Sequence, residues 1–319
     1  MKSLRKILKD FTGDERGFGL VLVTAGMVTL MGFAALVTDV GMLTLNKLRL
    51  SNAVDAAALA GAHELPYNTS LAKNVARDYA ARNGFNPDEP VISAHNGRNN
   101  SKITVTATRE VNYIFAKVLS LNSGTVSGSA TAVVEGLTSY KGAAPLAIPD
   151  QNFDYNTRYI LKQGANSDVL SPLGPGTFGA LSLGGTGASN YESNLKYGYD
   201  ERLSVGQEVD TETGNMSNPT KRAIDYRIGQ CTHSPPCSPA SYAPGCPRIL
   251  IVPVYEPTLI ESGQIKKIRI IGFAAFLVDR VTGQGNDNYI EGYFLRMTAE
   301  GDSDSGQTDY GLKGIKLIE

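Results

Sequence analysis

A long apolar run near the start of the chain is the strongest pattern in the sequence. The 22 residues from Gly17 to Thr38, GFGLVLVTAGMVTLMGFAALVT, include no charged side chain. About 20 such residues suffice for a helix to cross the ~30 Å hydrocarbon core of a bilayer. A secretory signal has an apolar region of only about 7–15 residues and an A-x-A exit, and no clear A-x-A follows here. The pattern therefore predicts a membrane-spanning helix over 18–38, in contact with the lipid bilayer.

The helical pattern continues beyond the apolar run. The sequence stays rich in Ala and Leu, and no proline occurs before Pro66. We therefore expect one helix over 18–62, whose second half stands outside the bilayer as an amphipathic stalk. Gly41 weakens the continuity and is a candidate kink. The expected apolar face of the stalk consists of Leu45, Leu48 and Leu59. Such a face is costly in water, so it must pack against a neighbouring element.

Residues 63–136 alternate between helical and strand patterns. The spacing of apolar residues predicts a helix at 69–83. Alternating side chains predict strands at 102–108 and 125–135, with a short helix at 112–119 between them. These strands are the nearest surfaces for the stalk helix, which gives a small α+β unit.

The composition changes after residue 136. Residues 137–149, GLTSYKGAAPLAI, are typical of a linker. Residues 150–319 contain no convincing amphipathic helix of three turns, and short strand patterns recur between Gly, Asn, Asp and Pro. We expect strands at 158–162, 177–183, 248–254, 265–277, 289–298 and 311–318. This punctuation favours a sandwich or barrel-like β domain. The expected fold class is α+β: a transmembrane helix that continues into a small α+β unit, followed by a separate β-rich domain.

The distribution of charge predicts an orientation and excludes one class of partner. The chain has 30 Lys and Arg against 31 Asp and Glu, a formal net charge of −1. A general nucleic-acid binder would carry a basic excess, so we expect no nucleic-acid partner. Five basic residues precede the apolar run, and two, Lys47 and Arg49, follow shortly after it. The positive-inside rule then places residues 1–17 in the cytoplasm as a basic leader and the bulk of the chain outside the cytoplasm.

None of the sequence motifs predicts catalysis or a cofactor. The segment from Gly174 to Gly179 matches G-x-G-x-x-G and residues 183–187 are glycine-rich. Neither has the setting of a nucleotide site, and we interpret both as turns. No G-x-S-x-G occurs for a serine hydrolase. Asp302 and Asp304 resemble the start of a calcium loop that lacks its later ligands, so we expect an acidic turn, with weak calcium binding as the alternative. We therefore expect no enzyme activity and no cofactor.

The cysteines form the densest chemical cluster of the sequence. Cys231, His233, Cys237 and Cys246 follow one another with the spacing C-x-H-x3-C-x8-C. Three thiols and one imidazole could hold zinc in a tetrahedral site, although this spacing is not a standard one. Thiols outside the cytoplasm tend to oxidise. We therefore favour a disulfide between Cys237 and Cys246 over a metal site, with Cys231–Cys237 as the second pairing.

The N-terminal motifs resemble those of a known family. The tripeptide ERG precedes the apolar run, DVG follows it at 39–41, and NAVDAAALAGA occupies 52–62. This pattern resembles the N-terminal segment of Tad (Flp) pilus-assembly proteins of the TadE/TadG-like family. The motif positions that carry the resemblance are Asp39, Gly41, Asn52, Asp55 and Gly61.

The resemblance implies a bacterial, single-pass membrane component of a Tad-type pilus or secretion system, similar to a minor pilin or pseudopilin. Its implied partners are other pilus-assembly subunits and further copies of itself. Related prepilins are cut after a glycine and favour a glutamate five residues later. The matching bond here is Gly17–Phe18, and Leu22 stands in the place of that glutamate. The alternative function is a membrane-tethered exported enzyme or ligand-binding β domain whose site the sequence does not display.

Two features of the apolar run leave alternatives open. Small residues such as Gly26 and Gly32 permit close approach of helices in lipid, and they are equally compatible with a monomeric anchor. Asp39 falls at the outer boundary of the run. We interpret it as a solvated interfacial carboxylate, with pairing to a partner's N-terminus or to a cation as the alternative.

Overall fold

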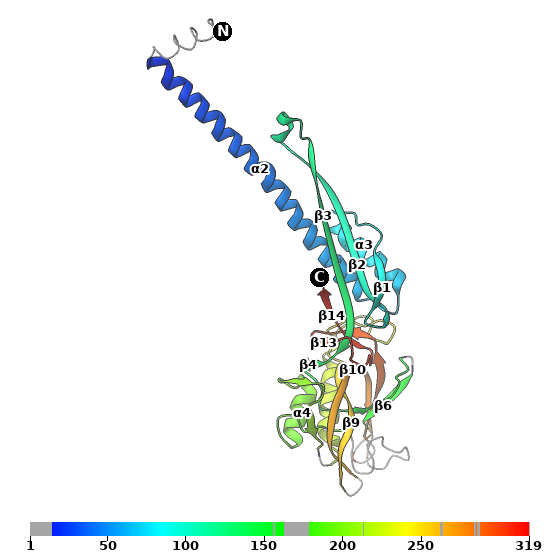
Figure 1. The fold of residues 1–319 in the computed structure, drawn as a ribbon. Coiled ribbons are helices and arrows are strands. Elements are labelled where there is room, and N and C mark those ends of the chain that lie inside the picture. The colour runs from blue at the N-terminus through cyan, green and yellow to red at the C-terminus, as the bar shows by residue number, and fades with distance from the viewer. Residues whose placement is uncertain are drawn as a thin grey trace.

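The computed structural model describes residues 15–155, 157–162, 179–212, 214–261, 264–283, 285 and 288–318. It has the α+β composition expected, with a long N-terminal helix followed by a strand-rich body (Figure 1). Helix α2, Glu15–Ala62, has 48 residues, which corresponds to a length of about 72 Å at ~1.5 Å per residue. It continues through Gly41 as one element, in agreement with the helix predicted over 18–62.

The part of α2 that follows the apolar run packs against a second helix and a sheet. Helix α3, Thr69–Arg82, begins at Asn68, whose side chain accepts a hydrogen bond from the Leu71 amide. Within the described residues the sheet has the strand order β1-β2-β3-β14-β12, and β13 pairs with β3. The strands are β1 (Val91–His95), β2 (Arg98–Asn112), β3 (Ser123–Leu137), β12 (Met297–Thr298), β13 (Ser303–Asp304) and β14 (Leu312–Ile318). The helix at 69–83 and the strands at 102–108 and 125–135 are thus confirmed, with longer strands than predicted.

The face that α2 buries differs from the predicted one. Leu45 and Leu48 are 46% and 58% exposed, so the prediction was wrong for these two leucines, whereas Leu59 is half-buried and packs against the core of the unit as expected. The buried side chains of the stalk are Leu50, Ala53, Val54, Ala57, Ala58 and Ala62. Small residues determine which face of α2 is buried, because they let the backbone of α2 approach its neighbours closely. A Cβ added at Gly128 of β3 would lie 3.2 Å from Leu50 Cγ.

The distal part of the chain is built on a second sheet. Within the described residues its order is β5-β9-β10-β11-β6, and β8 pairs with β10, while β4 and β7 form a separate pair. The strands are β4 (Ser139–Lys141), β5 (Ile148–Pro149), β6 (Arg158–Lys162), β7 (Arg202–Ser204), β8 (Glu208–Asp210), β9 (Ile249–Glu261), β10 (Gln264–Thr282) and β11 (Tyr289–Leu295). Strands predicted at 158–162, 248–254, 265–277, 289–298 and 311–318 therefore occur. Of the strand predicted at 177–183, residues 177 and 178 lie outside the described residues, and the rest makes only isolated bridges at Ala180 and Leu181.

Both faces of this second sheet are covered. Phe273, Ala275 and Leu277 of β10 belong to one buried apolar cluster. The alternating Ala274, Phe276 and Val278 belong to another. Successive side chains of a strand point to opposite faces, so each face has its own core. Helices α4 (Ala188–Tyr197) and α5 (Ser217–Gly229) contribute Tyr191, Leu195, Ala223 and Ile224 to the second cluster.

Three predictions about this region need correction. Helix α5 has 13 residues, so the region does contain a helix of three turns. The sequence pattern of α5 is weak because the helix has few apolar residues. The short helix predicted at 112–119 is reduced to the 3-10 turn η1, Ala116–Leu119, because β2 extends to Asn112. The segment 137–149 is not an exposed linker, since it supplies β4 and β5 and its residues Ala143–Ile148 are buried.

The chain also returns to its N-terminal unit at its end. Strand β14 pairs antiparallel with β3, from Lys313 opposite Gly136 to Ile318 opposite Thr131. The predicted boundary at 137–149 therefore does not separate the two sheets, because the first sheet contains strands from both sides of it. The last strand of the region 150–319 completes the sheet on which α2 packs.

Candidate functional site

The apolar half of α2 stands away from the rest of the molecule. From residue 17 to residue 38 only Ala35 is half-buried and all other side chains are exposed. Among the described residues this is the one helix that is long and apolar enough to cross a membrane, with a mean hydropathy of 2.3 over its most apolar window. The hydroxyls of Thr24, Thr29 and Thr38 each donate to the backbone carbonyl four residues earlier. These polar side chains are thus satisfied within the helix, as a lipid environment requires.

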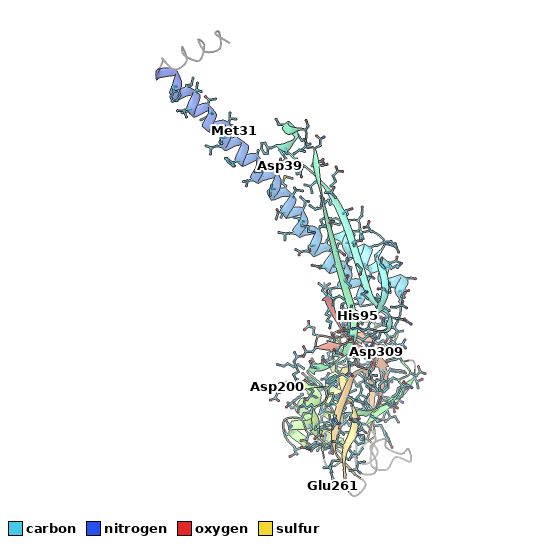
Figure 2. All side chains as sticks on the ribbon, viewed as in Figure 1. Met31, Asp39, His95, Asp200, Glu261 and Asp309 are labelled. Carbon is cyan, nitrogen blue, oxygen red and sulfur yellow. The ribbon has the colours of Figure 1, made fainter. Side chains whose placement is uncertain are left out.

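Asp39 lies where the apolar run ends, and it binds the backbone of a distant loop. Its carboxylate accepts hydrogen bonds from the amides of Ile114, Phe115 and Ala116, at 2.8, 3.1 and 2.7 Å. Asp39 is only 4% exposed, and Figure 2 shows it beside the end of the β2–β3 hairpin. The interpretation of Asp39 as a solvated interfacial carboxylate was wrong, because the carboxylate is buried and binds amides of the same chain. Its pairing with a partner's N-terminus or with a cation stays a prediction.

The loop that Asp39 holds is the tip of the β2–β3 hairpin. The two strands pair as far as Asn112 and Ser123, and residues 113–122 form the tip. Four large apolar side chains of the tip are exposed, and Val118 is exposed most, at 88%. The four are Ile114, Phe115, Val118 and Leu121. The fold therefore places a second apolar surface at the level where the apolar helix segment ends.

The other motif positions serve the packing of α2. A Cβ at Gly61 would lie 2.8 Å from both the Ala72 carbonyl oxygen and Ile103 Cδ1, so a glycine is needed where α2 meets α3 and β2. Gly41 has open space around it. Asn52 is exposed and Asp55 is half-buried. Gly17 and Phe18 are exposed near the start of the helix, and whether the bond between them is cut stays a prediction.

The cysteine cluster converges in the distal part of the chain. Cys231, Cys237 and Cys246 are all free thiols, so the disulfide expected between Cys237 and Cys246 is not formed in this structure. Instead, the three sulfurs and a ring nitrogen of His233 lie within 4.8 Å of one another. A hydrogen bond from His233 lowers the pKa of Cys231 to about 6, whereas burial raises the pKa of Cys246 to about 12.

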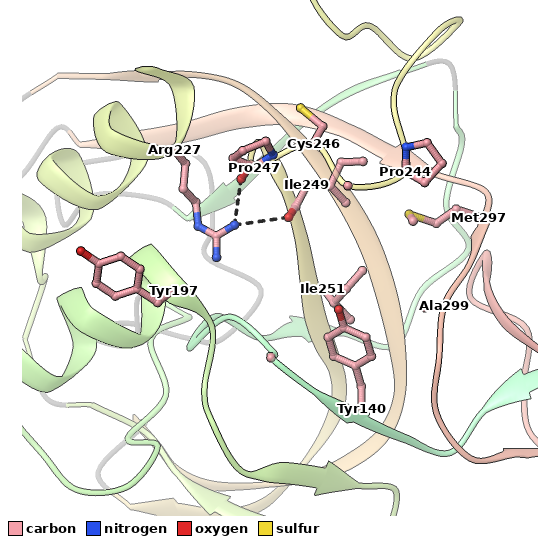
Figure 3. Close-up of a pocket in the computed structure, with 12 residues that line it drawn as sticks. Tyr140, Tyr197, Arg227, Pro244, Cys246, Pro247, Ile249, Ile251, Met297 and Ala299 are labelled. Atoms are coloured by element: carbon pink, nitrogen blue, oxygen red, sulfur yellow. Dashed lines mark hydrogen bonds between the residues drawn. The ribbon is translucent and has the colours of Figure 1, made fainter. Parts of the chain in front are cut away.

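A cavity of about 290 Å³ adjoins this cluster (Figure 3). Arg227 projects from α5 into its wall and donates to the backbone carbonyls of Leu195 and Pro247, at 2.5 and 2.8 Å. Burial lowers the pKa of Arg227 to about 10. The described residues that line the cavity include no carboxylate and no imidazole, which are the usual groups for acid–base chemistry.

The turns interpreted from the sequence are found where the structure describes them. Gly184, Gly185 and Gly187 have positive φ angles in the loop before α4, and the amide of Gly187 donates to the buried Glu212 carboxylate at 2.8 Å. Ser303 and Asp304 form the short strand β13, and the turn follows at residues 305–306, where the Gly306 amide donates to the Asp304 side chain. Of the motif at Gly174–Gly179, only Gly179 lies within the described residues.

Comparisons with known proteins agree with the geometry of the N-terminal helix. No curated protein and no solved structure matches the chain. Residues 17–64 match a family model, Tad, described as "Putative Flp pilus-assembly TadE/G-like". This match ends two residues after the end of α2, and it confirms the resemblance carried by the motifs at 39–41 and 52–62. The N-terminal segment of this chain, residues 17–64, is therefore similar to the TadE/G-like, Flp pilus-assembly family.

Proposed function

We propose that this protein is a membrane-anchored, non-enzymatic component of a bacterial Tad-type pilus or secretion system, similar to a minor pilin or pseudopilin. The observation that carries the proposal is one continuous helix, α2, whose first half is apolar and exposed and whose second half forms the core of a folded unit. The family match over residues 17–64 supports the same role.

The exposed half of α2 needs a cover. Each large apolar side chain left in water costs about 1.5–3 kcal/mol, and this segment exposes more than ten of them. A bilayer covers such a helix before assembly, and the apolar helices of other subunits can cover it afterwards. Gly26 and Gly32 have nothing within 4 Å of an added Cβ. They leave flat positions at which a second helix can approach closely.

The hairpin tip sets the depth of the anchor. Asp39 ties residues 114–116 to the end of the apolar run, so the exposed side chains of the tip lie level with the membrane boundary. In the proposed arrangement Ile114, Phe115, Val118 and Leu121 enter the lipid interface. Lys117, in the same tip, reaches the level of the lipid headgroups, where a long lysine side chain can keep its ammonium in water.

We further propose that the N-terminus is cytoplasmic and that the folded body lies outside the cytoplasm. Support comes from the basic residues that precede the apolar run, which the positive-inside rule retains in the cytoplasm. The strand-rich body then presents its surface to other subunits.

A crosslinking experiment tests this function. A photoreactive residue replaces Leu30 in one variant and Tyr197 in the matched control, because these side chains are 70% and 68% exposed but lie on the apolar run and on the distal body. In cells that express the whole pilus apparatus, position 30 should crosslink to the apolar helix of another pilus-assembly subunit or of a second copy. A Leu30 variant that yields only lipid adducts during active assembly would contradict the role.

Orientation is tested separately with the full chain. Alkaline phosphatase fused after Glu319 should be active, because the enzyme folds only outside the cytoplasm. An inactive fusion, together with an active cytoplasmic reporter at the same position, would reverse the orientation.

A further inference from the structure

The segment between α5 and β9 is unusually long for a connection without secondary structure. Residues 230–248 contain no helix or strand, only an isolated bridge between Ser238 and Ser241. Loops longer than about 12–15 residues are uncommon in compact domains unless function or a cross-link accounts for them. Cys237 and Cys246 are nevertheless buried in the apolar cluster on one face of the second sheet. Something therefore holds this loop in place.

The geometry of the cluster matches four ligands around one metal ion. In a tetrahedral site with Zn–S of ~2.3 Å and Zn–N of ~2.05 Å, two sulfurs lie about 3.8 Å apart and a sulfur and a nitrogen about 3.6 Å apart. Here Cys231 Sγ lies 3.5 Å from Cys246 Sγ and 3.6 Å from His233 Nδ1. All four ligand atoms lie within 4.8 Å of one another.

We propose that Cys231, His233, Cys237 and Cys246 form a structural zinc site. Sulfur and imidazole ligands in a tetrahedral arrangement are the donor set that Zn²⁺ prefers. Four protein ligands complete the tetrahedron, so no position stays open for a substrate. The metal replaces the protons of the three thiols, and its affinity is therefore coupled to proton release.

The surroundings of the sulfurs fit thiolate ligands. The amide of Ala243 donates to Cys237 Sγ at 3.5 Å. Arg248, itself buried, donates to the Cys237 carbonyl at 3.0 Å and to the Val278 carbonyl of β10 at 2.8 Å. One Zn²⁺ with three thiolates carries a net charge of −1, and the Arg248 guanidinium also faces the Asp279 carboxylate at 3.8 Å. The same arginine ties the ligand loop to the second sheet.

A disulfide would engage fewer of the four clustered side chains than a zinc ion does. Any one pairing would leave the third thiol and the imidazole of His233 in the cluster without a role. A zinc ion engages all four groups and closes the loop at both ends, from Cys231 just after α5 to Cys246 just before β9. The loop also forms one wall of the cavity in Figure 3, where Pro244 and Cys246 lie. Zinc would therefore fix the shape of that wall.

The test uses the full chain, solubilised in detergent and purified without a reductant from cells supplied with zinc. Mass spectrometric metal analysis should find about one zinc per chain, as expected for a single tetrahedral site. Three thiols should become reactive when the protein is denatured with a chelator. Replacement of zinc by Co²⁺ should produce sulfur-to-cobalt charge-transfer bands.

Variants then locate the metal. Cys246→Ser and His233→Ala should weaken zinc binding at least tenfold in competition with a chelator, because even the outer partners of metal ligands contribute about 10–100-fold to affinity. Thr232→Ala is the matched control, since Thr232 is exposed and lies between two ligands in sequence. His63→Ala is a second control, since His63 is exposed and lies far along the chain. Both controls should bind zinc as the unaltered chain does.

Two outcomes would overturn the proposal. One is metal-free protein with a disulfide between any two of the cysteines. The other is metal-free protein with three reactive thiols that take up neither Zn²⁺ nor Co²⁺. Because the measurement is made on the solubilised chain, its result does not depend on the proposed role in pilus assembly.

Discussion

The carboxylate of Asp39 accepts a 2.7 Å hydrogen bond from the backbone amide of Ala116, a residue 77 positions later in the chain. This contact joins the end of the apolar helix segment to the tip of the β2–β3 hairpin. Because the amides of Ile114 and Phe115 bind the same carboxylate, the tip is fixed at a defined height on α2. The position of the tip along α2 is therefore held by hydrogen bonds to one side chain.

Asp39→Ala should release the hairpin tip. The substitution leaves three amides without their acceptor, and an unsatisfied buried donor costs about 1–3 kcal/mol. Hydrogen exchange at residues 114–116 should become faster in the variant, while exchange in the paired strands stays unchanged. Asp55→Asn, on the same helix, is the control. Equal exchange at the tip in the Asp39 variant and in the unaltered chain would show that the contact does not hold the loop.

Val118→Trp should report the position of the tip in the bilayer. The chain contains no tryptophan, so the new side chain would be its one tryptophan fluorophore. In vesicles its emission should shift to the blue and be quenched by brominated lipids, because the tip enters the interface. Tyr197→Trp gives the comparison, since Tyr197 is exposed on the distal body. Identical emission from the two variants would show that the tip does not enter the membrane.

Gly61→Ala should destabilise the N-terminal unit. The added methyl group would meet the Ala72 carbonyl oxygen and Ile103 Cδ1, both at 2.8 Å, and overpacking of this kind costs about 1–3 kcal/mol. Gly41→Ala is the matched control, because the same change there meets open space. It should be neutral or stabilise the helix by up to about 1 kcal/mol. Thermal unfolding in detergent, followed by circular dichroism, compares the two. Equal melting temperatures would contradict the close packing at Gly61.

The stability of the folded body should rise as pH increases from about 8 to about 10. Burial lowers the pKa of Lys162 and of Lys313 to about 8, below the ordinary value of 10.5. In this window the unfolded chain keeps protons that the folded chain has released, so deprotonation favours folding. The slope reaches at most about 1.4 kcal/mol per pH unit for each lysine. Cys246 opposes this rise above about pH 9, because burial raises its pKa to about 12 and an unfolded cysteine ionises first. Above the window the effect reverses, because burial also raises the pKa of Tyr310 to about 12 and unfolded tyrosines ionise first.

Lys313→Met isolates one of these lysines. Lys313 is buried beside the ring of Tyr67, and its ammonium donates to the Leu65 carbonyl. The variant should lose about half of the rise in stability between pH 8 and 10. Lys141→Met serves as the control, since Lys141 is exposed. Thermal unfolding at several pH values measures both, and a rise of the same size in the Lys313 variant would exclude this lysine as a cause.

The sequence by itself determined the elements with strong local patterns. Twenty-two uncharged residues fix a helix of membrane-spanning length because the bilayer sets that length. The motif at 52–62 was sufficient to indicate the family segment that the comparison found over 17–64. Alternating side chains located β2, β3 and most strands of the second sheet, since period-2 burial is a local property.

Tertiary structure decided what local patterns do not encode. Helix α5 was missed because it has few apolar residues. They form a buried face only when the helix packs against β10. The buried face of α2 was mispredicted because close approach at Gly128 and the alanines of α3 selected Leu50 and Val54 over Leu45 and Leu48. The partners of Asp39 lie 75–77 residues away. The cysteine cluster becomes a set of converging ligands only once the loop is folded on the second sheet. Each of these depends on contacts between distant segments, and sequence spacing carries no information about such distances.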